Sequence, residues 1–103
     1  MLLIREVMYC KPGKVRPLLE KFQAMTKLMQ RTGMGKMRVL TDVSAERYWT
    51  VVSEMEVKDL KSFEDMMSGQ GQNPQDQKEF EKIMQGYHEL VDHGRREIYK
   101  IEG

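Results

Sequence analysis

The chain has little of several things on which large classes of proteins depend. Its 103 residues include one cysteine, two histidines and three prolines, and its 17 Lys and Arg nearly balance its 16 Asp and Glu. The lone Cys10 closes no disulfide within the chain, which favours a reducing cytoplasm. Two histidines five residues apart and one distant cysteine match no zinc spacing, so we expect no metal. The near-neutral charge argues against a dedicated nucleic-acid-binding protein.

Long apolar runs are missing too. No uninterrupted stretch of about 18 apolar residues occurs, so we expect no segment that crosses a membrane. Arg5 and Glu6 interrupt the apolar start of the chain, which argues against the core of a signal peptide. The remaining composition, 40% hydrophobic and 32% charged, is typical of a folded protein. The length fits a single domain, residues 1–103, because domains usually hold roughly 100 to 200 residues.

The first half of the chain predicts a strand, a helix and two further strands. Residues 2–10 are apolar and rich in β-favouring types, and Lys-Pro-Gly at 11–13 ends them. A helix that stops near Gly33 follows, because its apolar residues recur at i, i+3, i+4 and i+7. Residues 36–42 and 47–57 alternate between apolar and polar side chains, as strands do, and a short polar turn joins them.

The second half predicts two helical segments and a closing strand. Lys58–Asp59 begins a helix, because an acidic residue is favoured in the first turn. A polar loop follows over residues 68–74, and a helix with an apolar stripe resumes at about Gln75. That helix ends at His93–Gly94, and residues 95–102 form the last strand. The order of elements is therefore βαββαβ.

This order predicts a ferredoxin-like α+β fold, a four-stranded antiparallel sheet with two helices on one face. The helices cover one face only, whereas strands 2–10 and 47–57 carry apolar residues on both sides. An uncovered apolar face usually marks an interface, so we expect a homodimer that packs through the open sheet face. The alternative is that charged side chains break up the patch and are simply solvated, namely Arg5, Arg38, Glu54 and Glu56.

Several segments together resemble the dimeric α+β barrel superfamily. They are Lys-Pro-Gly-Lys at 11–14, Ser-Glu-Met-Glu at 53–56, Asp-Leu at 59–60 and the closing Gly94–Tyr99. The nearest branches are antibiotic-biosynthesis-monooxygenase-like and NIPSNAP-like proteins. The resemblance implies a sheet-to-sheet dimer with a cavity between sheet and helices. Some members oxidise aromatic polyketides there without a metal or flavin, and others degrade haem or isomerise lactones.

The part of the resemblance that concerns haem does not extend to this sequence. Haem-degrading members use an Asn on the first strand and a Trp and a His in the second helical region. Here the first strand carries Val7 and Tyr9, and the second helical region carries Phe63 and Met66 where a Trp is expected. His88 lies in the last predicted helix without companions. We therefore expect no haem and no other cofactor.

Four polar side chains are candidates for proton transfer or for contact with a ligand. His88 is the candidate catalytic residue, because histidine titrates near neutral pH and acts as general acid or base. The alternative is a surface pair with Asp92, four residues further on. Tyr9 and Tyr48 are candidate phenol donors toward a ligand. Arg38 is a candidate for stabilising an anion such as an enolate.

The remaining candidates are carboxylates and apolar side chains. Glu54 and Glu56 lie two apart on one side of a strand, where burial of both would raise one pKa. At a strand end, however, we expect both to be solvated. Met66 and Tyr87 lie on helix faces that meet the sheet. Methionine there suits either a pocket for a flat hydrophobic ligand or a loosely specified core.

Three functions are consistent with these residues. The first is a cofactor-independent monooxygenase or isomerase that acts on a small hydrophobic or aromatic metabolite. The second is a non-catalytic dimeric module that binds a ligand or regulates, with a filled core and no internal cavity. The third is RNA binding, because the RNA recognition motif shares the βαββαβ order, but Tyr48 is the only aromatic where that motif stacks two bases. We therefore expect no nucleic-acid partner.

Overall fold

The computed structural model describes residues 1–33, 35–69 and 73–103, and within them the predicted βαββαβ order is confirmed. The elements are β1 (Leu2–Cys10), α1 (Val15–Thr32), β2 (Met37–Thr41), β3 (Thr50–Val57), α2 (Leu60–Met67), α3 (Pro74–Met84), the 3₁₀ turn η1 (Tyr87–Glu89) and β4 (Val91–Lys100). Among the helices in the described ranges, none is both long and apolar enough to span a membrane.

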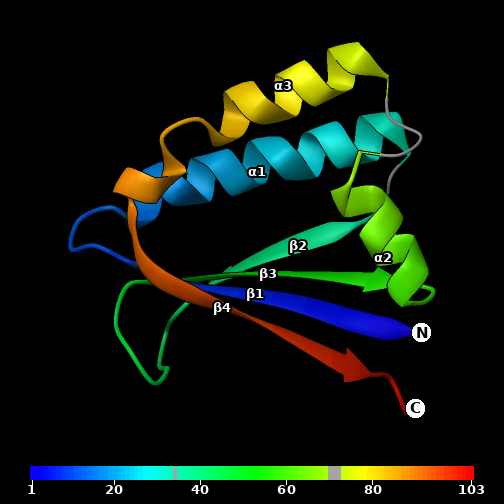
Figure 1. Cartoon of the computed structure of the whole chain (residues 1–103). Helices are drawn as coiled ribbons and strands as arrows, with labels where there is room; N and C mark the ends of the chain where they lie inside the picture. The colour runs from blue at the N-terminus through cyan, green and yellow to red at the C-terminus, as the bar shows by residue number, and fades with distance from the viewer. Residues whose placement is uncertain (34, 70–72) are drawn as a thin grey trace.

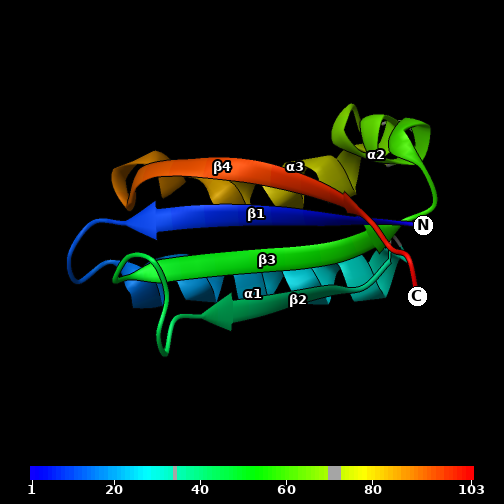
Figure 2. The same ribbon diagram turned by 90° about the horizontal axis from the view of Figure 1, so that it is seen from below.

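The four strands form one sheet in the order β2-β3-β1-β4, and every neighbouring pair is antiparallel. Helices α1 and α3 lie side by side on one face, while α2 lies near the end of the sheet where the two termini emerge (Figures 1 and 2). Figure 2 shows the opposite face of the sheet uncovered along its length. The predicted ferredoxin-like α+β fold is therefore confirmed.

The core lies between the sheet and α1. Its buried residues come from three strands and one helix, and they are Cys10, Leu18, Phe22, Met29, Met37 and Val51. Partly buried methionines on the helices and on β3 pack against this cluster, among them Met25, Met55, Met66 and Met84. Flexible thioether side chains fill irregular gaps between a twisted sheet and its helices. These methionines thus contribute to the core.

Helix ends are fixed by side-chain and backbone caps. The carboxylate of Asp59 accepts a hydrogen bond from the backbone N–H of Ser62 over 2.8 Å and begins α2. The side-chain oxygen of Asn73 accepts one from the N–H of Asp76 over 2.8 Å and begins α3. Gly33 ends α1 with φ of 74°, a left-handed conformation that glycine adopts without strain.

The predicted last helix is too long. Helix α3 ends at Met84, and Gly86 then turns the chain with φ of 80°. The strand β4 begins at Val91, so His93 and Gly94 are strand residues and do not end a helix. The predicted strand 47–57 begins only at Thr50, because residues 44–49 form bends. The start of β4 and the bend before β3 lie at the same end of the sheet (Figure 1).

Candidate functional site

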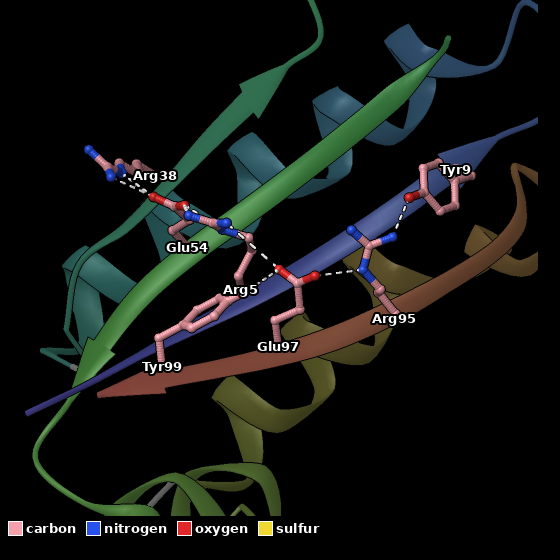
Figure 3. Close-up of polar contacts among 7 residues, drawn as sticks. All are labelled: Arg5, Tyr9, Arg38, Glu54, Arg95, Glu97 and Tyr99. Carbon is pink, nitrogen blue, oxygen red and sulfur yellow. Dashed lines mark hydrogen bonds and ion pairs between the residues drawn. The ribbon is translucent and has the colours of Figure 1, made fainter. Parts of the chain in front are cut away.

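Charged side chains cross the sheet face that is turned away from the helices, here called the open face (Figure 3). Glu54 on β3 is 5% exposed and accepts hydrogen bonds from Nε of Arg5 and Nε of Arg38, each over 2.7 Å. Both arginines lie opposite Glu54 in the strand register. Burial alone would raise the pKa of Glu54, but the hydrogen bonds from Arg38 and Arg5 outweigh burial and lower it. The prediction of a solvated Glu54 is therefore wrong.

The network continues from β1 to β4. Glu97 lies 3.7 Å from Nη1 of Arg5 and accepts a hydrogen bond from Nε of Arg95 over 2.7 Å. Arg95 also donates to the hydroxyl of Tyr9, and the guanidinium of Arg5 lies 5.5 Å from the centroid of the Tyr99 ring. The hydrogen bond between Arg95 and Glu97 lowers the pKa of Glu97 and raises the pKa of Arg95. Charges do interrupt the apolar face, as the alternative had it. Arg5, Arg38 and Glu54 are paired with one another, whereas Glu56 is exposed.

Three segments that are distant in the sequence meet at the end of the sheet opposite the termini (Figure 1). They are the end of β1 with the loop after it, the bend over residues 44–49, and the start of β4. They form a pocket of about 470 Å³, here called the strand-end pocket. Its lining residues are Tyr9, Cys10, Lys11, Pro12, Arg47, Tyr48, Trp49 and Asp92.

A buried tyrosine and two basic side chains lie together at this pocket. The guanidinium of Arg47 lies 4.9 Å from the centroid of the Tyr9 ring, and the ring of His93 lies 4.8 Å from it. Nη1 of Arg47 is 2.9 Å from Nε2 of His93, and Nδ1 of His93 is 3.1 Å from a carboxylate oxygen of Asp92. A guanidinium only donates, so Nε2 of His93 accepts, and Nδ1 carries the hydrogen that Asp92 accepts. This arrangement orients the His93 ring between Arg47 and Asp92.

The bend that carries the pocket aromatics is held by several hydrogen bonds. The N–H of Cys10 donates to the carbonyl of Trp49 over 2.8 Å, and the N–H of Thr50 donates to the carboxylate of Asp42 over 2.8 Å. The hydroxyl of Thr50 donates to the carbonyl of Arg47, also over 2.8 Å. Trp49 has φ of 58°, a backbone conformation that is unfavourable for a residue with a large side chain. The three hydrogen bonds of the bend maintain this conformation. The backbone of Trp49 is therefore held in place, and its indole stays exposed at the pocket.

Similarity to known proteins is found in structure and not in sequence. No protein-family model matches it, and neither does any curated protein. A NIPSNAP domain protein from Burkholderia xenovorans, itself uncharacterised, superposes with a TM-score of 0.72 at 19% identity over 99% of this chain and 95% of its own. An uncharacterised NIPSNAP-like protein from the same organism gives 0.73 at 14% identity over 98% and 84%. A Bacteroides thetaiotaomicron protein, provisionally assigned as an antibiotic biosynthesis monooxygenase, gives 0.68 at 11% identity over 97% and 88%.

The chain has the fold of the NIPSNAP-like and antibiotic-biosynthesis-monooxygenase-like proteins. The resemblance that the sequence motifs suggested is confirmed at that level. At sequence identities of 10 to 19%, these comparisons show a shared fold alone. Proteins with the same fold carry many unrelated functions, so the function of this member must be argued from its own side chains.

Four of the residues predicted to bind a ligand lie on the open face or at its end. Tyr9 and Tyr48 line the strand-end pocket together. Arg38 and Glu54 pair on the open face. The hydrogen bonds and ion pairs of the open face connect that pair to Tyr9 across the whole sheet (Figure 3). A role for these four in ligand binding stays a prediction.

The other three predicted site residues lie on the helix side of the sheet. Met66 on α2 and Tyr87 in η1 pack against the core. His88 is exposed in η1, with its ring centroid 4.0 Å from that of Tyr87. It is not among the residues that line the strand-end pocket, and its predicted partner Asp92 hydrogen-bonds His93. A catalytic role for His88 stays a prediction, as do ligand-binding roles for Met66 and Tyr87.

The sequence analysis missed most of the pocket. Lys11, Arg47 and Trp49 were not singled out as site residues, and His93 was placed at a helix end. One signal was available: the only tryptophan of the chain follows directly on an arginine and a tyrosine. Within the described ranges, no group of three or more His, Cys, Asp or Glu side chains is placed to hold a metal ion. The chemistry that the pocket offers is therefore that of aromatic faces beside guanidinium and ammonium groups.

Proposed function

We propose that this protein is a small-molecule-binding module that takes a flat aromatic ligand in the strand-end pocket. The observation that carries this proposal is the pair of exposed aromatic side chains, Tyr48 and Trp49, at a pocket of about 470 Å³ that the buried Tyr9 also lines. That volume falls in the range of small-molecule sites, about 300 to 1,000 Å³, and such sites are lined mainly by apolar and aromatic side chains. Aromatic rings gain about 0.5 to 1.5 kcal/mol per stacked pair beyond area burial.

The single tryptophan gives a direct test of ligand binding. In ¹⁵N-labelled protein, Trp49 is the source of the only indole N–H signal, and it lies at the pocket. A panel of bicyclic and polycyclic aromatic compounds is expected to shift this signal and to saturate it. Tyr48→Ala is expected to weaken binding several-fold, whereas Phe80→Ala, an exposed aromatic on α3, leaves it unchanged. If no compound moves the indole signal at millimolar concentration, the proposal fails.

We also propose that two copies of the chain associate through their open faces. Leu40 and Tyr99 are exposed large side chains on this face, and the charges between them are already paired. Paired charges cost less to desolvate than free ones, so they do not prevent a second sheet from packing there. In this proposal, the strand-end pocket opens at the edge of the dimer interface.

Sedimentation velocity distinguishes a dimer from a monomer of 12.2 kDa. Leu40→Asp is expected to shift the protein toward the monomer, because it puts an unpaired charge into the proposed interface. Phe80→Asp is the matched control, since Phe80 is 39% exposed on the helix side and Leu40 is 40% exposed on the open face. A wild-type protein that sediments as a monomer at about 100 µM contradicts the dimer.

An enzymatic role as a cofactor-independent monooxygenase or isomerase is the second candidate, and the Asp92–His93 pair favours it. A carboxylate that accepts from Nδ1 orients an imidazole as a base, and nearby guanidinium groups stabilise an enolate or phenolate. The chain has two histidines, so His93→Gln and His88→Gln separate the two proposed bases. Oxygen uptake and absorbance changes with phenols and lactones are the readouts. If the wild type turns over none of these compounds, binding without catalysis is the function that we propose.

Residence in the cytoplasm remains a proposal that rests on the single, buried cysteine.

A further inference from the structure

We infer that the ligand of the strand-end pocket is an aromatic anion, recognised through its negative group by Arg47 with support from Lys11. The inference rests on the proposed function, since it names the class of ligand for the same pocket. It follows from how the positive charges of the chain are paired and how Arg47 is held.

Most arginines of this protein are neutralised by glutamates, but Arg47 is not. Five of the seven arginines form ion pairs, namely Arg5, Arg31, Arg38, Arg95 and Arg96. Over the described ranges, neither Arg47 nor Arg16 has a carboxylate oxygen within 4.0 Å. Both side chains are exposed, but Arg47 lines the strand-end pocket, whereas Arg16 lies on α1. The site therefore has a cation whose charge the protein leaves uncompensated.

Arg47 is also fixed in orientation. Its guanidinium lies over the Tyr9 ring, 4.9 Å from the centroid, and Nη1 donates to Nε2 of His93 over 2.9 Å. One of its five N–H groups is used in that hydrogen bond, and the others remain to bind a carboxylate in two-point fashion. A guanidinium held in this way loses little side-chain entropy on binding. Lys11 lines the same pocket and has no ion pair among the described residues.

The one acidic side chain of the lining does not reverse this balance. Asp92 faces the pocket, but one of its oxygens accepts the hydrogen of His93 Nδ1. Two cations against one carboxylate give the lining a formal charge of +1. A rival arrangement is an aromatic cage for a ligand cation. That rival is disfavoured because the Tyr9 face is already occupied by the guanidinium of Arg47.

Three naphthalene compounds of similar size test the charge of the ligand: 2-naphthoate, neutral 2-naphthamide and cationic 2-naphthylmethylamine. At about pH 7.5 the carboxylate is ionised and the amine is protonated. Isothermal titration calorimetry gives the affinities, and the indole N–H signal of Trp49 shows that binding occurs in the pocket. We expect 2-naphthoate to bind at least about tenfold more tightly than the amide, because hydrogen bonds between charged groups are stronger than neutral ones. This preference is expected to weaken as salt is added.

Variants assign the preference to Arg47. Arg47→Gln is expected to lower the affinity for 2-naphthoate to that of the same variant for 2-naphthamide, and so to remove the preference for the anion. Arg16→Gln, which removes the other unpaired arginine, keeps the preference. If Arg47→Gln also fails to bind the amide, two other measurements are used: the affinities of Lys11→Gln and the salt dependence of the wild type. The inference is refuted if neither Lys11→Gln nor added salt reduces the preference for 2-naphthoate over the amide.

The outcomes separate this inference from the proposal on which it rests. If none of the three compounds moves the Trp49 signal, the proposed aromatic pocket itself fails. If the amide or the amine binds as tightly as 2-naphthoate, the pocket stands and the anion inference is refuted. A preference for 2-naphthoate that Arg16→Gln abolishes as fully as Arg47→Gln also refutes it, because the effect is then one of net charge.

Discussion

Replacing Glu54 by glutamine tests whether the network on the open face stabilises the fold. Glutamine keeps the shape of the side chain but replaces one acceptor oxygen with a donor, which then faces a guanidinium. Each hydrogen bond to a charged partner is worth about 1.5 to 3 kcal/mol when it is buried. Glu54 is 5% exposed, but its partners Arg5 and Arg38 are 36% and 74% exposed and remain solvated after the change. Exposed pairs contribute about 0.2 to 1 kcal/mol.

Glu54 accepts two such hydrogen bonds, and a value between the buried and exposed limits gives a loss of about 2 kcal/mol in the free energy of unfolding for Glu54→Gln at neutral pH. For a chain of this length the loss corresponds to a Tm lower by roughly 10 °C. Urea unfolding at one fixed protein concentration measures the free energy, since association would make stability depend on concentration. Arg5→Gln is expected to cost more than Arg38→Gln, because Arg38 is twice as exposed.

Glu56→Gln is the matched control. Glu56 lies two residues further along β3 on the same face, is exposed and forms no ion pair with a described residue. Its replacement is expected to change stability by less than about 0.5 kcal/mol. Equal effects of Glu54→Gln and Glu56→Gln would refute the reasoning, because burial and pairing would then count for nothing.

The pH dependence gives a second check on Glu54. Its pKa in the folded protein is lower than the ordinary value of 4.5, so the folded state binds this proton less readily than the unfolded chain. The stabilisation by Glu54 is therefore fully present above about pH 4.5 and is lost as the pH falls through the folded pKa. The difference between wild type and Glu54→Gln is expected to shrink below that pH and to stay constant between about pH 6 and 8.

Two further changes test the packing and the helix caps. Gly94→Ala is expected to destabilise the protein by about 1 to 3 kcal/mol in thermal unfolding, because a Cβ there would lie 2.8 Å from the carbonyl oxygen of Val7 and 2.6 Å from the sulfur of Met8. Gly103→Ala is the control, since no atom lies near a Cβ at that position. Equal Tm values for the two variants would contradict the close packing of β4 on β1. Asn73→Ala is expected to cost about 1 kcal/mol through loss of the cap of α3, and Asn73→Asp to restore most of it; an unchanged urea midpoint for the alanine variant would contradict the cap.

Most of the fold could be predicted because its elements have clear local patterns. The spacing of Leu18, Phe22 and Met29 marks α1 whatever it packs against, and the αL glycine at Gly33 marks its end. The last helix was extended too far because the apolar spacing continues past Met84 to Tyr87 and beyond. The glycine at position 86 was the available signal for the break, because glycine adopts left-handed conformations without strain. In the structure Gly86 has φ of 80°.

The candidate site was harder to predict because it depends on contacts between distant segments. The burial of Glu54 follows from the register that places Arg5 and Arg38 on either side of it, and alternation within one strand does not reveal register. The strand-end pocket joins β1, a bend and β4. Trp49 alternates with its neighbours as a strand residue would, so its place in a bend with positive φ left no trace in the sequence.

The central claim is that a ligand binds at the strand ends and not between the sheet and the helices. Nuclear Overhauser effects between the ring protons of 2-naphthoate and the protein test it most directly. We expect cross-peaks to Tyr48 and to the indole of Trp49, which line the pocket. Cross-peaks to the methyl groups of core methionines such as Met25 and Met84, with none to Trp49, would contradict it.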